Sequence, residues 1–175
     1  MTEAQLSNAM DAYGSTVYRL ALTRMQNIAD AEDVYQEVFL RLWKQAAEDW
    51  DGDRAKAWLI RTTLNRCADL HRFRLRRPVL SFAEIPDLAQ PEDESRELWE
   101  AVSRLPEKAR TAVHLYYAEG YSAEEIGRLM HIPATTVRTR LHRARRQLKE
   151  LLGGNDDEAC VSRFDGTDSD PRRAE

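Results

Sequence analysis

The segment Ser122–Arg146 constrains the fold more than any other part of this sequence, because its pattern is typical of two short helices separated by a tight turn. Ser122 and Glu125 have the spacing of a capping box, in which the two residues satisfy backbone N–H groups at the start of a helix. Ile126 and Leu129 supply an apolar stripe at helical spacing. A helix is therefore predicted to begin at Ser122.

The second helix of this segment is predicted to begin near Pro133. Proline disrupts a helix interior but is tolerated in a first turn, so His131–Pro133 is predicted to form the turn. One side of the new helix is expected to be buried, because apolar residues recur along it at helical spacing. These residues are Val137, Leu141, Ala144 and Leu148.

The other side of this second helix is strongly basic. No Asp or Glu occurs between Ile126 and Lys149. Basic amphipathic helices also coat membranes or form solvated faces, but the capping box and the short turn favour a helix-turn-helix that enters a DNA groove. The cationic residues are Arg128, Arg138, Arg140, Arg143, Arg145, Arg146 and Lys149.

The chain contains a second basic block although its formal net charge is −4. From residue 153 onward there are seven acids and three arginines, so this tail carries the whole negative excess. Within the second block, Asp69 is the only acid. Two separated cationic blocks suggest two contacts with a polyanion. The block comprises Arg54, Lys56, Arg61, Arg66, Arg72, Arg74, Arg76 and Arg77.

Several protein classes are disfavoured by the sequence. It has no apolar run of about 18 residues and no basic start followed by an apolar core, so neither a membrane span nor a signal peptide is predicted and a cytoplasmic protein is expected. Cys67 and Cys160 are too few for a disulfide framework or a four-ligand zinc site, and Cys67 has the spacing of a buried residue. We find no phosphate-binding glycine loop, no HExxH and no convincing nucleophile, so no enzyme, metal or cofactor is expected.

Three helices are predicted in the first 77 residues. Apolar residues between Leu6 and Leu20 recur at steps of three and four, which places them on one helix face. Asp30 is predicted to cap a second helix, residues 51–53 to form a turn, and residues 57–68 to bury one side of a third helix. The apolar side of the second helix is expected to comprise Val34, Val38, Phe39, Leu42 and Trp43.

The remainder of the chain is predicted to contain a linker, a second domain and a tail. Helical periodicity fails over residues 78–94, where prolines stand among acids, so we expect a linker there. Residues 95–152 are predicted to form four helices, and residues 153–175 an acidic disordered tail. The expected fold class is all-α, with two small helical domains joined by a flexible linker.

Three motifs, taken in order, resemble those of a known family. They are ADAEDVYQEVFLRLW at residues 29–43, AWLIRTTLNRCADLHR at residues 57–72, and the segment 105–148 with the helix-turn-helix. Together they resemble regions 2 and 4 of the sigma-70 family of bacterial RNA polymerase sigma factors, and the compact two-domain form is similar to the extracytoplasmic-function (ECF) subgroup. The resemblance covers most of residues 1–152 and implies three partners: core RNA polymerase, promoter DNA and an anti-sigma factor.

The resemblance implies that the second helix docks on core RNA polymerase. Acids beside an exposed aromatic residue would offer charge steering and apolar area to a helical partner. Val34 and Phe39 fit ordinary core packing instead. The implied docking residues are Asp33, Gln36, Glu37, Leu40 and Trp43.

The third helix matches the part of the family that opens and reads the −10 promoter element. Capture of an unstacked strand needs cations along the phosphates, a platform for a base and a polar group that reads an extruded base. Trp58 fits either the platform or the core, and Asn65 matches the family asparagine near the recognised base. The phosphate candidates are Arg61, Arg66, Arg72, Arg74, Arg76 and Arg77.

The last helix matches the part of the family that reads the −35 element. His131 stands where many relatives have glycine, at a position that favours positive φ, so backbone strain is expected there. The family pattern places Arg138, Thr139, His142 and Arg143 at base edges, and Arg140, Arg145 and Arg146 near phosphates.

The sequence therefore predicts a transcription initiation factor without catalytic chemistry of its own. Two other classes of protein are also compatible with a carboxyl-terminal helix-turn-helix. A self-sufficient DNA-binding regulator would dimerise and bind palindromic DNA without polymerase. A recombinase-type enzyme would need a nucleophile in the front domain, and none is clear.

Overall fold

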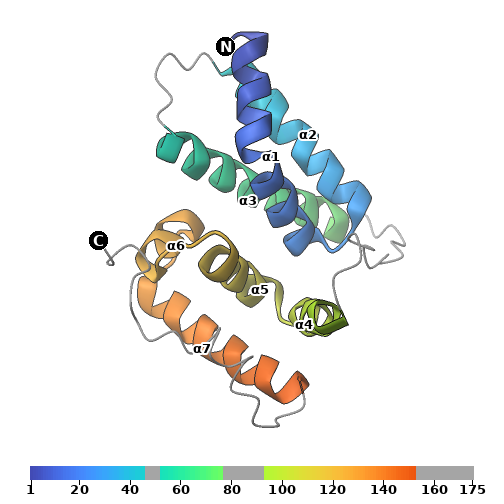
Figure 1. Cartoon of the computed structure of the whole chain (residues 1–175), viewed down its shortest axis with the longest axis vertical. Coiled ribbons are helices and arrows are strands. Elements are labelled where there is room, and N and C mark those ends of the chain that lie inside the picture. The colour runs from blue at the N-terminus through green and yellow to red at the C-terminus, as the bar shows by residue number, and fades with distance from the viewer. Residues whose placement is uncertain (46–51, 77–92, 153–175) are drawn as a thin grey trace. The chain divides into compact units, whose positions relative to one another are not determined.

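The computed structural model describes residues 1–45, 52–76 and 93–152 (Figure 1). They fall into two units, one within residues 1–87 and one within residues 88–175. Every regular element in the described residues is a helix, which confirms the all-α fold class. None of these helices combines the length and apolar character needed to cross a membrane. Most of the expected linker and the whole expected tail lie outside the described residues.

The first unit contains α1 (Glu3–Met25), α2 (Ile28–Lys44) and α3 (Gly52–Arg76). Each of these helices packs against the other two. Their apolar residues recur at helical spacing, and the full burial of each large aliphatic side chain contributes roughly 1.5–3 kcal/mol. The core includes Val17, Leu20, Val34, Val38, Leu42, Leu59, Ile60, Leu64 and Cys67.

The start of α2 differs from the prediction. Asn27 is the N-cap, and its side chain accepts a hydrogen bond from the Asp30 N–H at 3.0 Å. Asp30 lies inside the first turn, where it is buried and pairs with Arg74 of α3. The prediction of Asp30 as the cap was wrong, because an equally good acceptor stands three residues earlier and tertiary contact uses the carboxylate.

Two further predictions for the first unit need correction. Trp43 is 42% exposed, so it does not belong to the apolar core of α2. Gly52 begins α3, so the turn predicted at residues 51–53 does not extend over Gly52 and Asp53. Asp51 lies outside the described residues.

The second unit contains the four predicted helices and one π-helical turn. In order they are α4 (Asp93–Ser103), α5 (Glu107–Val113), the π turn η1 (His114–Ala118), α6 (Ala123–Met130) and α7 (Ala134–Leu151). α7 packs against α4, α5 and α6. α4 begins at Asp93, two residues before the predicted start of the second domain at residue 95.

The helix-turn-helix of α6 and α7 forms as the sequence predicts. Ser122 and Glu125 make the reciprocal capping box, with N···O distances of 3.3 Å and 2.9 Å. His131 closes α6 in the left-handed region at φ 54°, which confirms the expected positive φ. A Cβ atom on Gly127 would lie 2.7 Å from the Ile132 carbonyl oxygen. Only glycine at this position therefore allows the backbone of the turn to pack so closely against α6. The predicted stripe of α7 is buried: Val137, Leu141, Ala144 and Leu148.

Candidate nucleic-acid interface

α7 presents polar and cationic side chains on the side opposite its buried stripe. Its 18 residues give a rod of about 27 Å, which exceeds the width of a DNA major groove. Among the predicted DNA contacts, Arg140 and Arg145 are half-buried. The others are exposed: Arg138, Thr139, His142, Arg143 and Arg146.

Two of the exposed arginines of α7 have acidic neighbours. Arg138 pairs with Glu124 of α6. The Nε of Arg146 lies 3.7 Å from an Oε of Glu150, one helical turn away. All four side chains are half exposed or more, and ion pairs in such places contribute only about 0–1 kcal/mol. Another hydrogen-bond acceptor can therefore displace either acid at small cost.

The predicted −10 surface of α3 is only partly open. Arg61 and Asn65 are exposed and lie one helical turn apart, whereas Trp58 is half-buried. Arg72 donates a hydrogen bond to the Asp69 carboxylate at 3.1 Å. The side chain of Arg76 and the whole of Arg77 lie outside the described residues.

Two other arginines of this surface contact acids on α2. Arg66 pairs with Glu37, which also accepts a hydrogen bond from Arg41 at 2.7 Å. Arg74 pairs with Asp30. The side chains of Arg66 and Arg74 are only 27% and 33% exposed. Sequence reasoning missed both pairs, because the partners stand 29 and 44 residues apart.

Asp30 occupies an unfavourable place for a charged carboxylate. Burial raises the pKa of this carboxyl above its usual 3.8, and Arg74 opposes that effect. Asp33 raises the pKa further. One carboxylate oxygen of Asp30 is buried without a hydrogen-bond partner among the described residues. The ion pair thus holds the end of α3 to the start of α2 at the cost of a partly unsatisfied charge.

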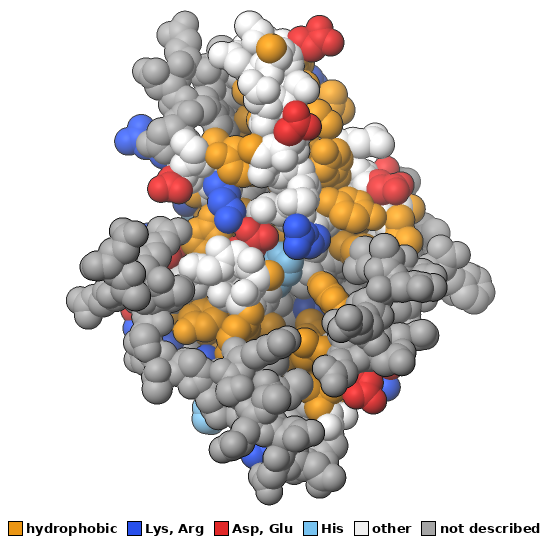
Figure 2. All heavy atoms as spheres, viewed as in Figure 1, with side chains coloured by type: hydrophobic (Ala, Val, Ile, Leu, Met, Phe, Trp, Pro, Cys, Tyr) orange, Lys and Arg blue, Asp and Glu red, His pale blue; other side chains and the backbone are white. Residues whose placement is uncertain are grey.

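The predicted docking residues share one face of α2. Asp33, Gln36, Leu40 and Trp43 follow one another at steps of three and four, and all four are exposed. Glu37 is half-buried beside them because of its arginine partners. Leu40 is 57% exposed, a high value for a large apolar side chain. Figure 2 shows that the surface of the first unit places apolar side chains beside acidic and basic ones.

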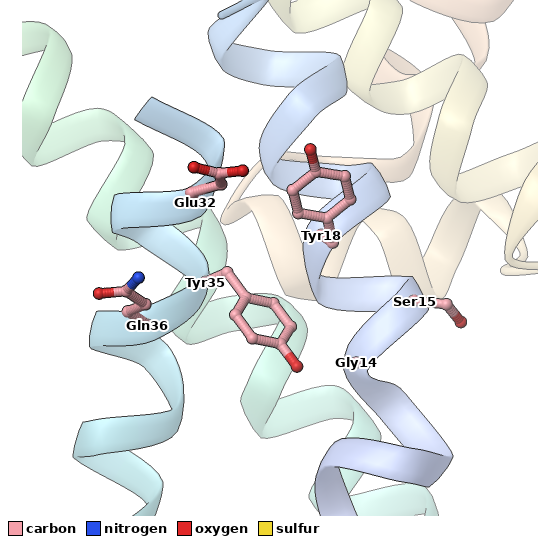
Figure 3. Close-up of a pocket in the computed structure, with 6 residues that line it drawn as sticks. All are labelled: Gly14, Ser15, Tyr18, Glu32, Tyr35 and Gln36. Atoms are coloured by element: carbon pink, nitrogen blue, oxygen red, sulfur yellow. The ribbon is translucent and has the colours of Figure 1, made fainter. Parts of the chain in front are cut away.

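A shallow pocket of about 480 Å³ adjoins this face and was not foreseen from the sequence. Gly14 on α1 makes room for Tyr35, since a Cβ atom there would lie 3.0 Å from the tyrosine hydroxyl. Figure 3 shows the Tyr35 ring pointing from α2 toward α1. Burial, assisted by Asp11, raises the pKa of Tyr35, so its phenol stays neutral. The pocket is lined by Gly14, Ser15, Tyr18, Glu32, Tyr35 and Gln36.

The described residues hold no group of three or more side chains that could bind a metal ion. Their chemistry lies instead in two helical surfaces, a cationic face on α7 within a helix-turn-helix and a mixed acidic and apolar face on α2. A helix-turn-helix with an exposed cationic face is typical of helical DNA-binding proteins, and exposed apolar side chains beside acids are suited to contact with another protein.

Comparison with known proteins identifies the family. The chain matches the models "Sigma-70 region 2" over residues 9–77 and "Sigma-70, region 4" over residues 95–148. It is 30% identical to the ECF RNA polymerase sigma factor SigW of Bacillus subtilis, over 83% of this chain and 88% of that protein. It is 34% identical to the ECF RNA polymerase sigma factor SigE of Mycolicibacterium smegmatis, over 86% of this chain but only 62% of that protein.

A solved structure agrees with this result. CnrH, determined in complex with the cytosolic domain of CnrY, superposes with a TM-score of 0.62 at 26% identity, over 88% of this chain and 91% of that chain. The chain belongs to the sigma-70 family of RNA polymerase sigma factors, in its ECF subgroup. This is a family of transcription initiation factors and not a family of enzymes.

Proposed function

We propose that this protein binds core RNA polymerase and directs it to promoters by contacting the −35 and −10 elements. Family membership supports this assignment. The one structural observation that carries it is the helix-turn-helix whose second helix, α7, buries an apolar stripe and exposes cations. The polymerase would supply the catalysis, so the protein itself needs no catalytic residue.

The proposed division of labour follows the two units. Residues 1–77 would bind the polymerase and the −10 element, residues 95–152 would bind the −35 element, and residues 78–94 would link them. On α7, exposed Arg138, Thr139, His142 and Arg143 would read base edges, while Arg140, Arg145 and Arg146 would contact phosphates.

The docking face of α2 is the proposed contact with core polymerase. Asp33 and Gln36 offer charge and hydrogen bonding, and Leu40 and Trp43 offer apolar area that stays in contact with water in the free protein. Protein interfaces draw most of their energy from a few such anchors. The face is therefore suited to a helical partner with basic side chains at its rim.

The −10 element would be captured on α3. Arg61 and Asn65 are exposed on one face, and half-buried Trp58 precedes Arg61 by three residues on the same helix. Arg72 would exchange its exposed contact with Asp69 for a phosphate. Arg66 and Arg74 would have to leave Glu37 and Asp30 before they could do the same.

We further propose an anti-sigma factor as a regulatory partner and the cytoplasm as the place of action. The related CnrH was solved in complex with the cytosolic domain of CnrY, and its fold extends over most of this chain. A partner that covers the α2 face would prevent polymerase from docking there.

Reconstituted transcription tests the proposal. Core polymerase and the full-length protein are incubated with a library of randomised promoters, and the transcribed templates are sequenced. The proposal expects enrichment of two conserved elements and RNA synthesis that depends on the added protein. Replacing both Leu40 and Trp43 by alanine should weaken polymerase binding at least about tenfold without lowering thermal stability, because both side chains are exposed. No transcription with the wild-type protein would refute the proposal.

A further inference from the structure

Two tyrosines outside α7 hold Arg145, one of the proposed phosphate contacts. The Nε of Arg145 donates a hydrogen bond to the Tyr117 hydroxyl at 2.7 Å. Its guanidinium carbon lies 5.9 Å from the ring centroids of both Tyr116 and Tyr117. The two rings meet edge to face, with centroids 4.9 Å apart. This tyrosine clamp, formed by Tyr116 and Tyr117, fixes the direction of the arginine side chain.

The tyrosine clamp lies in the π turn η1, between α5 and the helix-turn-helix. Single π turns inside helices are uncommon and are found frequently at functional sites. After η1 the chain turns sharply, with Gly120 at φ 72° and the Tyr121 N–H bonded to the Leu115 carbonyl at 3.0 Å. The segment that leads into α6 therefore also carries the two rings that contact α7.

The neutral partner distinguishes Arg145 from other arginines of α7. Arg138 pairs with a carboxylate, and Arg146 lies close to one. Within the described residues, Arg145 makes no ion pair, and its hydrogen bond goes to a phenol. A phenol orients a guanidinium without neutralising it, and the bond occupies only one of five N–H donors. The terminal nitrogens of Arg145 therefore keep both their charge and their hydrogen-bonding capacity for a phosphate.

We propose that Tyr117 is a positioning residue that orients Arg145 for one phosphate of the DNA backbone. The inference rests on the proposed function of α7 as a DNA-binding helix. A long, freely rotating arginine side chain loses conformational entropy when a phosphate immobilises it. The contact with Tyr117 restrains that side chain before DNA arrives, so binding loses less entropy.

The test uses the full-length protein assembled with core polymerase, on a promoter duplex selected by that holoenzyme from a randomised library. Tyr117→Phe removes the hydroxyl and keeps the ring. Tyr116→Phe is the matched control, because no hydrogen bond of the Tyr116 hydroxyl occurs within the described part of the chain. Arg145→Ala and the Tyr117→Phe/Arg145→Ala double variant complete the set. Promoter affinity is measured at several salt concentrations, and thermal unfolding is followed for each variant.

We expect Tyr117→Phe to weaken promoter binding about 3- to 10-fold and Tyr116→Phe to weaken it less than about 2-fold. Arg145→Ala should reduce the slope of log affinity against log salt by about 1, as the loss of one phosphate contact requires. In the Arg145→Ala background, Tyr117→Phe should cause no further loss, because the two residues act through one contact.

Three outcomes would overturn the inference while leaving the proposed function intact. The two phenylalanine variants could bind alike, Tyr117→Phe could weaken binding equally with and without Arg145, or the loss of affinity could simply follow a loss of folded protein. Each would mean that Tyr117 does not act on DNA binding by orienting Arg145. A wild-type holoenzyme that selects no promoter would instead refute the proposed function itself.

Discussion

The arginines that the sequence predicts to contact DNA differ in the groups that their guanidinium nitrogens contact in the structure. Arg66 and Arg74 pair with carboxylates of α2, and Arg145 bonds to a neutral phenol. Arg143 makes no ion pair or hydrogen bond within the described residues and is exposed. Availability for DNA is therefore a property of each side chain and not of the basic block as a whole.

Arg143→Ala and Arg146→Ala are predicted to impair DNA binding in different ways. Bidentate contact of an arginine with guanine contributes roughly 1–3 kcal/mol of discrimination, whereas a phosphate contact strengthens all sequences alike. Arg143→Ala should therefore relax −35 specificity, and Arg146→Ala should weaken binding uniformly. Binding to matched and scrambled −35 duplexes separates the two effects. Both side chains are exposed, so neither change should unfold the protein. Equal losses on both duplexes for both variants would contradict this division.

Asp30→Asn is predicted to change the pH dependence of stability. The pKa of Asp30 is raised in the folded protein, mainly by burial, so the folded state binds this proton more tightly than the unfolded state. The group therefore contributes stability below its unfolded pKa, and this contribution is lost as pH rises through the folded pKa. Asparagine has no such proton. The stability of the variant relative to wild type should thus rise as pH increases from the usual aspartate pKa through the raised pKa of folded Asp30.

Urea unfolding of both proteins at several pH values measures this difference. The variant also removes the ion pair with Arg74, but that guanidinium is one-third exposed and can turn to water. A relative stability that stays constant or falls over the same pH range would show that the Asp30 carboxyl is not destabilised by burial.

At the scale of helices, the sequence correctly predicts those structural features that depend on residues close together in the chain. The capping box of α6, the buried stripe of α7 and the positive φ at His131 are all confirmed, because each is set by contacts within a few residues. The cap of α2 was mispredicted where two candidates three residues apart compete, Asn27 and Asp30. The ion pairs between α2 and α3, the α1–α2 pocket and the contact of η1 with α7 were missed, since they depend on tertiary packing that no local pattern encodes.

Gly127→Ala is predicted to destabilise the helix-turn-helix by about 1–3 kcal/mol. The added Cβ would lie 2.7 Å from the Ile132 carbonyl oxygen and 3.3 Å from the Ala134 nitrogen, and backbone at a tight turn cannot easily move. Chemical unfolding measures the loss. Gly14→Ala is the control, because its Cβ would approach only the Tyr35 ring and hydroxyl, which can shift. Equal stability of the Gly127 variant and wild type would contradict the tight-turn account.

Glu37→Gln is predicted to release Arg66 from α2. Removal of the carboxylate charge leaves Arg66 without its ion-pair partner and available to phosphates. Arg41 loses the same partner, but it lies on α2 and is not among the residues proposed to contact DNA. The free protein should then bind single-stranded DNA more tightly, and one additional phosphate contact should steepen the slope of log affinity against log salt by about 0.7. Fluorescence anisotropy with a labelled oligonucleotide, at several salt concentrations, measures both changes.

Glu32→Gln provides the matched control for this experiment. Glu32 is an exposed acid on the same helix and forms no ion pair within the described ranges, so its replacement changes the net charge equally without releasing an arginine. If the two variants bind the oligonucleotide equally, then total charge rather than Arg66 governs the effect.

At the scale of the whole molecule, the charge is divided unevenly along the chain. Residues 1–152 are neutral on balance, and residues 153–175 carry the net negative charge. Deletion of residues 153–175 is predicted to raise affinity for DNA at low salt, since seven acids on the same chain repel phosphates and attract the basic helices. The gain should disappear at high salt. An unchanged affinity throughout a salt titration would contradict the prediction.

The ion pairs of Arg66 with Glu37 and of Arg74 with Asp30 have a consequence for the protein while it is not bound to its proposed partner. Attraction between bare cations and a phosphate backbone does not depend on sequence, so abundant cellular RNA competes for every such group. With two guanidinium groups already bound to carboxylates, we expect the unassembled chain to be retained less by RNA. A larger share of its molecules should then stay free to meet core polymerase, the partner proposed above.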